Sequence, residues 1–254
     1  MSDLLVVVAL VLQIQNGQPV GTATGFFYVK NDTIYFVTNR HVVIDETKGI
    51  KSDLLRVRLH TDPNDLTKNK DVDIPLYTNG MAKWHVHPNY STKKIDIAIV
   101  EIDPNNLQPY YFKALSATVF LPKEFPLALG EDVMVIGFPR GLSDTTHNLP
   151  INRSAMISSA HTIDFQGNPQ FLVDANLHPG MSGSPVMTRA KSIWATSDGA
   201  LKAYKEPVPY FLGVFSATLG FKLPSGQQEQ LGLGTVWHGY LIEEIIDSMS
   251  KKNP

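Results

Sequence analysis

"HPGMSGSPV", residues 178–186, is the stretch on which the interpretation of the whole chain depends. Glycine relaxes the backbone and proline fixes it, so a stretch rich in both is predicted to form a tight loop. Such a loop can hold a serine nucleophile, with backbone N–H groups free to meet developing negative charge. Ser184 precedes Pro185 and begins the next strand-like run, so Ser182 is the preferred nucleophile.

A nucleophilic serine needs a base, which is usually a histidine oriented by a carboxylate. "FVTNRHVV" (36–43) places His41 directly after a β-rich run. "KKIDIAIV" (93–100) places Asp96 inside an apolar strand, where a carboxylate is costly to bury without a hydrogen-bonding partner such as imidazole. The wide separations between His41, Asp96 and Ser182 fit a site formed where two β units meet.

An α/β-hydrolase elbow is the alternative arrangement around a loop serine. It requires the pattern G-x-S-x-G and the chain order serine, acid, histidine. Position 184 is serine instead of glycine, although Asp198 and His238 nominally supply the order. Because the alternation of strands and helices typical of that fold is missing, the sequence disfavours this alternative.

The apolar segments of the chain are mostly short and β-like. "DLLRVRLH" (53–60), for example, alternates apolar and polar residues along its length. Many short strands separated by turns predict an all-β fold. The expected units are two β-barrels, at about 8–110 and 128–235, joined by the irregular, proline-rich stretch 102–130. Apolar residues at helical spacing predict a C-terminal α-helix over about 237–250.

Composition excludes several classes of function. The chain has 254 residues and a formal net charge of −2, which favours neither a nucleic-acid nor a membrane partner. It contains no cysteine, so disulfides and thiolate metal sites are excluded. "LLVVVALVL" (4–12) has the length of a signal-peptide core, but no basic residue precedes it and no cleavage pattern follows. It is interpreted as a buried strand of a cytoplasmic protein; an exported protein whose signal peptide was removed is the alternative.

Three segments together resemble the histidine, aspartate and serine motifs of the trypsin-like (chymotrypsin-fold) serine peptidases in their cysteine-free bacterial form. They are "VTNRHVV", "HPNYSTKKIDIAIV" and "DANLHPGMSGSPV". The resemblance extends over about residues 20–246. Within the family, the chain is similar to the high-temperature-requirement proteases and the glutamyl endopeptidases. It implies a single peptidase domain over 1–254, built of two antiparallel six-stranded β-barrels with a C-terminal helix, and requiring no cofactor.

The resemblance also implies roles for individual residues. Ser182 is expected to be the nucleophile, His41 the general base and Asp96 its orienting carboxylate. The backbone N–H groups of Gly180 and Ser182 are expected to form the oxyanion hole. The substrate is then a protein or peptide; the alternative is a latent or regulatory module of the same fold that needs a partner or stimulus.

The resemblance places the substrate-binding residues less sharply. Asn176 and Leu177 are expected near the base of the primary specificity pocket. Ser216, Ala217 and Thr218 are expected along its wall. No acid is placed as in trypsin, so a small or medium apolar side chain is the expected preference. Preference for glutamate would require a cation in this pocket.

Two further positions carry expectations. Digestive enzymes of the family have an acidic residue just before the nucleophile, which pairs with a newly cut N-terminus. Position 181 is Met, so activation of that kind is not expected. His85 and His87 in "WHVH" resemble a metal pair, but no third ligand is apparent and no metal is expected.

Overall fold

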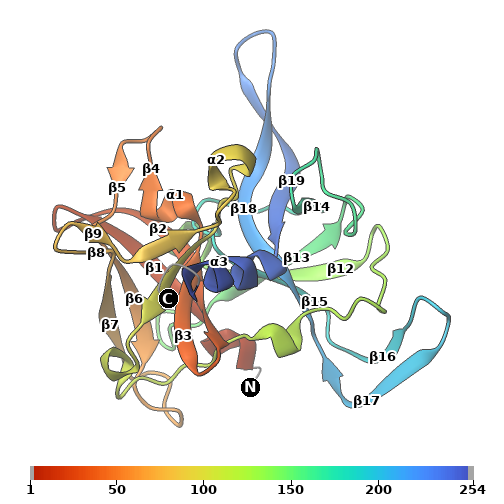
Figure 1. Ribbon diagram of the computed structural model, residues 1–254, viewed down its shortest axis with the longest axis horizontal. Helices are drawn as coiled ribbons and strands as arrows, with labels where there is room; N and C mark the ends of the chain where they lie inside the picture. The colour runs from red at the N-terminus through yellow and green to blue at the C-terminus, as the bar shows by residue number, and fades with distance from the viewer. Residues whose placement is uncertain (1–2, 251–254) are drawn as a thin grey trace.

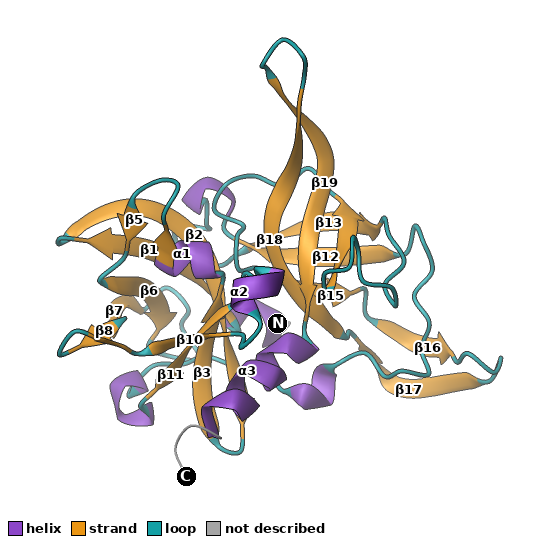
Figure 2. Cartoon of the chain, turned by 45° about the horizontal axis from the view of Figure 1, so that its top comes forward, coloured by secondary structure: helices purple, strands orange, loops and turns teal. Residues whose placement is uncertain are grey.

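The protein, analysed as a computed structural model that describes residues 3–250, consists of two β units side by side and a C-terminal helix (Figure 1). Strands dominate the structure, and helices are short except for the last (Figure 2). The all-β prediction is therefore confirmed. No helix within residues 3–250 is long and apolar enough to cross a membrane.

The first unit is a seven-stranded antiparallel sheet in the order β10-β11-β3-β2-β1-β6-β7. Its strands are β1 (Val8–Gln15), β2 (Gln18–Lys30), β3 (Thr33–Thr38), β6 (Leu54–His60), β7 (Asn69–Pro75), β10 (Trp84–Val86) and β11 (Ala98–Ile102). The expected six-stranded barrel is thus a seven-stranded sheet here, because the short β10 adds a strand beside β11. The predicted alternation along β6 is confirmed, since Leu55, Val57 and Leu59 are buried.

The second unit is a closed six-stranded barrel in the order β12-β13-β14-β19-β18-β15, as predicted. Its strands are β12 (Asp132–Gly137), β13 (Ile151–Ile157), β14 (Gln170–Asp174), β15 (Pro185–Thr188), β18 (Phe211–Lys222) and β19 (Gln228–His238). Figure 1 shows the long β18–β19 hairpin extending well beyond this barrel.

Small elements decorate both units. The two-stranded hairpins are β4 (Ile44–Asp45) with β5 (Ile50–Lys51), β8 (Tyr77–Thr78) with β9 (Met81–Ala82), and β16 (Lys191–Ala195) with β17 (Leu201–Val208). The helices are α1 (Arg40–Val43), α2 (Tyr90–Lys93) and α3 (Tyr240–Ser250), and the 3-10 helices are η1 (Asp3–Val6), η2 (Pro104–Leu107), η3 (Ala117–Val119) and η4 (Pro139–Gly141).

The C-terminal helix begins later than its predicted start at about residue 237. Trp237 and His238 instead extend β19, because Trp237 pairs with Gln170 of β14 and His238 pairs with Gly213 of β18. Helix α3 follows from Tyr240.

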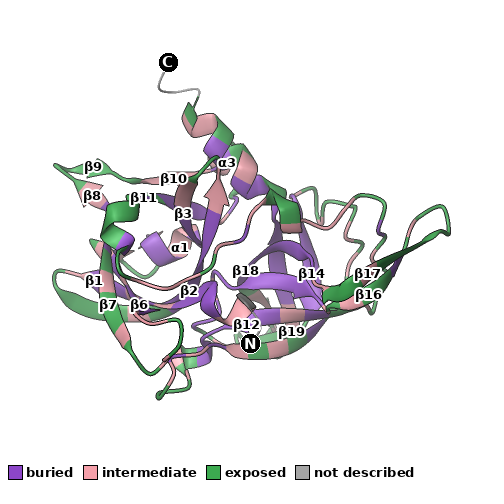
Figure 3. Cartoon of the chain, turned by 90° about the horizontal axis from the view of Figure 1, so that it is seen from below, coloured by how far each residue is buried: buried purple, intermediate pink, exposed green. Residues whose placement is uncertain are grey.

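A shared apolar cluster joins the two units. It contains Ile97 and Ile99 at β11, Ile136 and Val214 of the second barrel, and the buried face of α3. The alternate residues of β11, Ala98, Val100 and Ile102, are buried in the separate core of the first unit. Over residues 98–100, strand β11 is therefore buried on both faces, which fits its position between the two cores. In Figure 3, the residues coloured as buried gather on the central strands, and the exposed ones on the peripheral hairpins and loops.

Candidate active site

His41 and Asp96 come from the ends of two paired strands. His41 lies in α1 directly after β3, and Asp96 stands just before β11; Thr38 of β3 pairs with Ala98 of β11. This pairing brings the two side chains to the same edge of the first sheet. The carboxylate Oδ2 of Asp96 lies 2.6 Å from Nδ1 of His41, and the backbone N–H of His41 donates to Oδ1 at 2.9 Å.

Ser216 completes the hydrogen bonding of Asp96 from the second unit. Its Oγ donates to Oδ2 of Asp96 at 2.6 Å. The carboxylate of Asp96 thus receives donors from His41 and from Ser216, which compensates its partial burial. The sequence placed Ser216 on a pocket wall and missed this contact. A serine that follows an apolar strand ("FLGVFS") was the available signal, because a buried hydroxyl there needs a partner.

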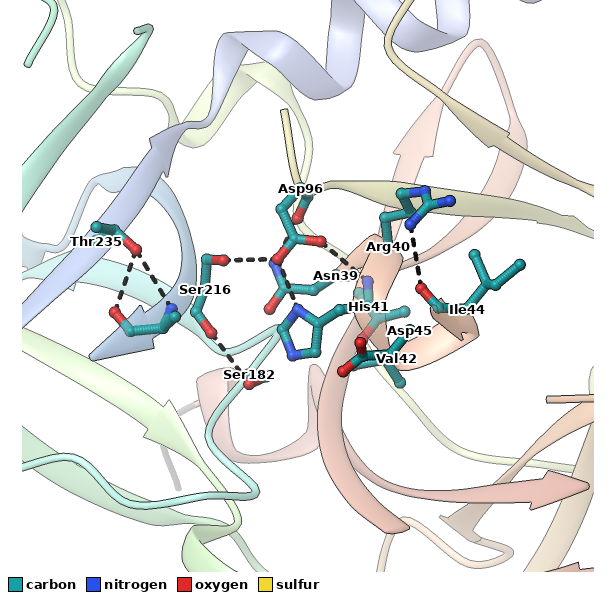
Figure 4. Close-up of polar contacts among 12 residues, drawn as sticks. Asn39, Arg40, His41, Val42, Ile44, Asp45, Asp96, Ser182, Ser216 and Thr235 are labelled. Atoms are coloured by element: carbon teal, nitrogen blue, oxygen red, sulfur yellow. Dashed lines mark hydrogen bonds and ion pairs between the residues drawn. The ribbon is translucent and has the colours of Figure 1, made fainter. Parts of the chain in front are cut away.

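Ser182 lies beside this pair on the loop after β14. Figure 4 shows the imidazole of His41 between Asp96 and Ser182. The Oγ of Ser182 donates a hydrogen bond to the backbone carbonyl of Ser216 at 3.0 Å. Within residues 3–250, the hydrogen bonds of the Ser182 hydroxyl do not include one to His41. All three predicted residues are therefore brought together, with the serine hydroxyl turned to a carbonyl oxygen.

The loop that carries Ser182 depends on glycine at two positions. Gly180 has φ of 96° and Gly183 has φ of 87°, a region that favours glycine. A Cβ at Gly180 would lie 2.4 Å from the carbonyl oxygen of Phe138, and one at Gly183 would lie 2.1 Å from that of Thr24. The loop therefore packs against backbone on both sides.

Thr24 of β2 fastens the loop to the first unit. Its N–H donates to the carbonyl of Ser182 at 2.9 Å, and its Oγ1 donates to the carbonyl of Gly180 at 2.8 Å. The carbonyl of Pro179 accepts the N–H of Arg140 at 2.6 Å. With these carbonyls engaged, none of the hydrogen bonds found in the described part of the chain uses the N–H of Gly180 or Ser182. The expected role of these two N–H groups in an oxyanion hole stays a prediction.

The expected pocket residues separate into two groups. Leu177 is buried in the core of the second barrel, as is Met181, whereas Asn176 is exposed. The carbonyl of Asn176 accepts a hydrogen bond from the Nη2 of Arg153 on β13 at 2.7 Å. Leu177 therefore contributes to the fold at this place and does not present its side chain at the surface.

The predicted wall residues follow one another along β18. Ala217 is exposed and Thr218 half-buried. The hydroxyl of Thr235 on β19 contacts both backbone groups of Ala217, accepting from its N–H at 3.3 Å and donating to its carbonyl at 3.1 Å. These contacts hold the backbone of β18 next to Ser216.

Arg40 and His87, which lie close in sequence to predicted site residues, make contacts with other parts of the protein. The Arg40 guanidinium pairs with Glu46, which raises the pKa of Arg40, and lies 4.4 Å from the ring centroid of Tyr90. The Nε2 of His87 lies 2.7 Å from a carboxylate oxygen of Glu244 on α3. In the part of the chain that the structure describes, no cluster of three metal-ligating side chains is present.

Comparison with known proteins identifies the family of the chain. A model of the trypsin-like peptidase domain matches residues 23–194. The chain belongs to the trypsin-like peptidase family, because that match covers more than half of its length.

Two solved structures share the fold. A serine endoprotease from Yersinia pestis superposes with a TM-score of 0.54 at 16% identity, over 97% of this chain and 63% of that chain. The inactive form of Rv3671c from Mycobacterium tuberculosis, a serine-to-alanine mutant, superposes with a TM-score of 0.50 at 18% identity, over 98% of this chain and 88% of that chain. The chain thus spans less than two thirds of the Yersinia protein. No curated protein matches it in sequence.

Proposed function

We propose that the protein is a serine endopeptidase that hydrolyses peptide bonds of a protein or peptide substrate through an acyl-enzyme. The convergence of His41, Asp96 and Ser182 beside two available N–H groups carries the proposal. The Ser182 oxygen attacks the scissile carbonyl carbon while His41 takes its proton at Nε2 and later gives it to the leaving amine. Asp96 holds the imidazole at Nδ1 and stabilises the cation that forms.

The oxyanion of the tetrahedral intermediate would be held by the N–H groups of Gly180 and Ser182. Water then attacks the acyl-enzyme, with His41 acting as base in the second half of the reaction. The site requires no cofactor for this chemistry. The preference for a small or medium apolar side chain before the scissile bond stays a prediction, which cleavage of a peptide library tests.

The test is labelling with a fluorophosphonate probe together with hydrolysis of a peptide library. We expect Ser182→Ala to abolish labelling and to lower turnover by on the order of 10⁴ or more. Ser184→Ala is the matched control, because the Ser184 hydroxyl is buried and has no hydrogen-bond partner among the described residues. Folded wild-type protein that never labels, under any condition, would exclude a competent free enzyme.

The second candidate is a latent module of the same fold that needs a partner or stimulus. The hydrogen bond from the Ser182 hydroxyl to the Ser216 carbonyl favours it, because a hydroxyl in that orientation is not in contact with its base. Labelling that appears only after a partner protein is added would support latency. Labelling of the isolated protein at once would support the free enzyme.

A further inference from the structure

Asn39 is a fully buried polar residue between β3 and α1, two residues before His41. It occupies the N-cap position of α1, where an asparagine side chain usually accepts an N–H group of the first turn. The side chain of Asn39 makes no such bond. Because a buried amide is costly unless it is hydrogen-bonded, this side chain is expected to have a partner elsewhere.

That partner is the main chain of Asp96. The Nδ2 of Asn39 donates to the carbonyl of Asp96 at 2.6 Å, and Figure 4 shows Asn39 beside Asp96 and His41. Asp96 precedes Ala98, where the pairing of β11 with β3 begins. Within residues 3–250, the main chain of Asp96 makes no other hydrogen bond. The main chain of Asp96 is therefore attached to the end of β3 through Asn39.

The same segment also holds the carboxylate of Asp96. The backbone N–H of His41 donates to Oδ1 at 2.9 Å, and Nδ1 of His41 lies 2.6 Å from Oδ2. Residues 39–41 thus contact Asp96 at its carbonyl and at its carboxylate. Because the side chain of Asp96 rotates about bonds that begin at its main chain, a fixed carbonyl restricts where the carboxylate lies.

The amide oxygen of Asn39 shows that this arrangement costs stability. Its Oδ1 is buried and has no hydrogen-bond partner in the part of the chain that the structure describes. An unpaired buried acceptor is destabilising, and an apolar residue at this position would not carry one. The contact with the carbonyl of Asp96 is what Asn39 supplies and an apolar residue cannot.

We propose that Asn39 is a positioning residue, which sets the carboxylate of Asp96 against Nδ1 of His41 through the main chain of Asp96. The inference rests on the proposed function and deepens it. Without the amide, the segment before β11 shifts, and the carboxylate orients the imidazole less precisely. The effect is on the chemical step and not on substrate binding, because the buried side chain of Asn39 does not reach a bound peptide.

The first test is Asn39→Ala, which removes the donor together with the unpaired oxygen. We expect kcat on a library peptide to fall about 10- to 100-fold with KM little changed, since a small displacement of a catalytic group has effects of this size. In the proton NMR spectrum of the free protein, the low-field signal of the proton between Nδ1 of His41 and Asp96 should weaken or move upfield.

The matched control is Ser52→Ala. Ser52 is equally buried, and its hydroxyl donates to the carbonyl of Val42 in α1 at 3.1 Å. The side chain of Ser52 therefore supports the helix that carries His41 without contacting Asp96. We expect Ser52→Ala to leave both kcat and the low-field signal as in the wild-type protein, although it also removes a buried hydrogen bond.

A double-mutant cycle measures whether Asn39 acts through the carboxylate. Asn39→Ala should add no further loss of activity to Asp96→Ala, because that variant has no carboxylate to orient. Additive losses would overturn the proposal, as would a low-field signal that is unchanged in Asn39→Ala or absent from the wild-type protein. Failure of the proposed function is distinguishable: wild-type protein would then hydrolyse no peptide, while the NMR comparison still decides whether Asn39 positions Asp96.

Discussion

Gly183 illustrates at the scale of one residue how closely the two β units approach each other. The position where its Cβ would stand is 2.1 Å from the Thr24 carbonyl oxygen and 2.6 Å from Oγ1 of Thr38. Both neighbours belong to the first unit, and one is backbone. A side chain at Gly183 would therefore separate the nucleophile loop from the sheet that carries His41.

We predict that Gly183→Ala lowers the free energy of unfolding by more than about 2 kcal/mol, because steric overlap adds to the strain of positive φ. Loss of fluorophosphonate labelling should accompany it. The matched control is Gly167→Ala: φ there is 72°, and nothing lies within 4 Å of the added Cβ. Urea denaturation of both variants measures the difference. Equal stabilities would contradict the clash.

The site residues were predictable from sequence to different degrees. Asp96 stood out because a carboxylate inside an apolar strand needs a partner, and His41 was a suitable one. The contact of Ser216 with Asp96 was missed because it joins two units 120 positions apart in sequence. Leu177 was placed near the base of the specificity pocket, and local sequence alone did not show that its side chain is buried in the core of the second barrel. The roles assigned to these residues remain predictions until the variants are measured.

At the scale of elements, α3 joins the two units. It continues from the second barrel, and its apolar face enters the cluster shared by both units through Leu241, Ile242, Ile245 and Ile246. Its polar face contacts the first unit: Glu243 with Tyr28 and Lys30, and Glu244 with His87. Burial, and then the contact with Glu243, raises the pKa of Tyr28, so its phenol stays a donor at neutral pH.

We predict that Ile245→Ala destabilises the protein by about 2–5 kcal/mol, since Ile245 is fully buried in the shared cluster. Asp247→Ala on the opposite face of α3 is the control. This variant loses only the ion pair of Asp247 with Lys30, and the Asp247 side chain is 60% exposed. Ion pairs at the surface contribute about 0–1 kcal/mol to stability. Guanidinium denaturation measures both. If Ile245→Ala lowered the free energy of unfolding no more than Asp247→Ala does, α3 would not stabilise the cluster shared by the two units.

Secondary structure was predictable where one periodicity dominated. The alternation of residues 53–60 became β6, and the helical spacing near the C-terminus became α3. The start of α3 was wrong because Trp237 and His238 fit either element by sequence, and their pairing across the barrel decides for β19. The seventh strand of the first sheet was missed because β10 has only 3 residues.

At the scale of the whole molecule, two histidines connect stability to pH. The rings of His161 and His238 lie 5.1 Å apart next to Phe171 and Tyr240. Burial lowers the pKa of each histidine from 6.5 to about 4. The unfolded chain therefore binds more protons than the folded protein between about pH 4 and 6.5, and stability increases with pH across this window.

We predict that the free energy of unfolding is independent of these histidines above about pH 6.5 and falls as the pH drops toward 4. The loss is on the order of a few kcal/mol for the pair. Urea denaturation at pH 7 and pH 4.5 measures it. The double variant His161→Phe, His238→Phe should show a distinctly smaller decrease, because the two buried histidines no longer contribute to it. An unchanged decrease in the double variant would contradict this origin.

The candidate site is divided between the two units, so we expect its reactivity to require both halves of the chain. His41 and Asp96 belong to the first half, and Ser182 and Ser216 to the second. Ala117 and Thr118, between the halves, are exposed, so the chain can be cut there. We predict that neither fragment gives fluorophosphonate labelling alone and that the mixture labels the C-terminal fragment. Labelling of the C-terminal fragment by itself would show that the first half is not needed. Because labelling returns only when the two halves associate, an enzymatic signal from the mixture would then measure that association directly.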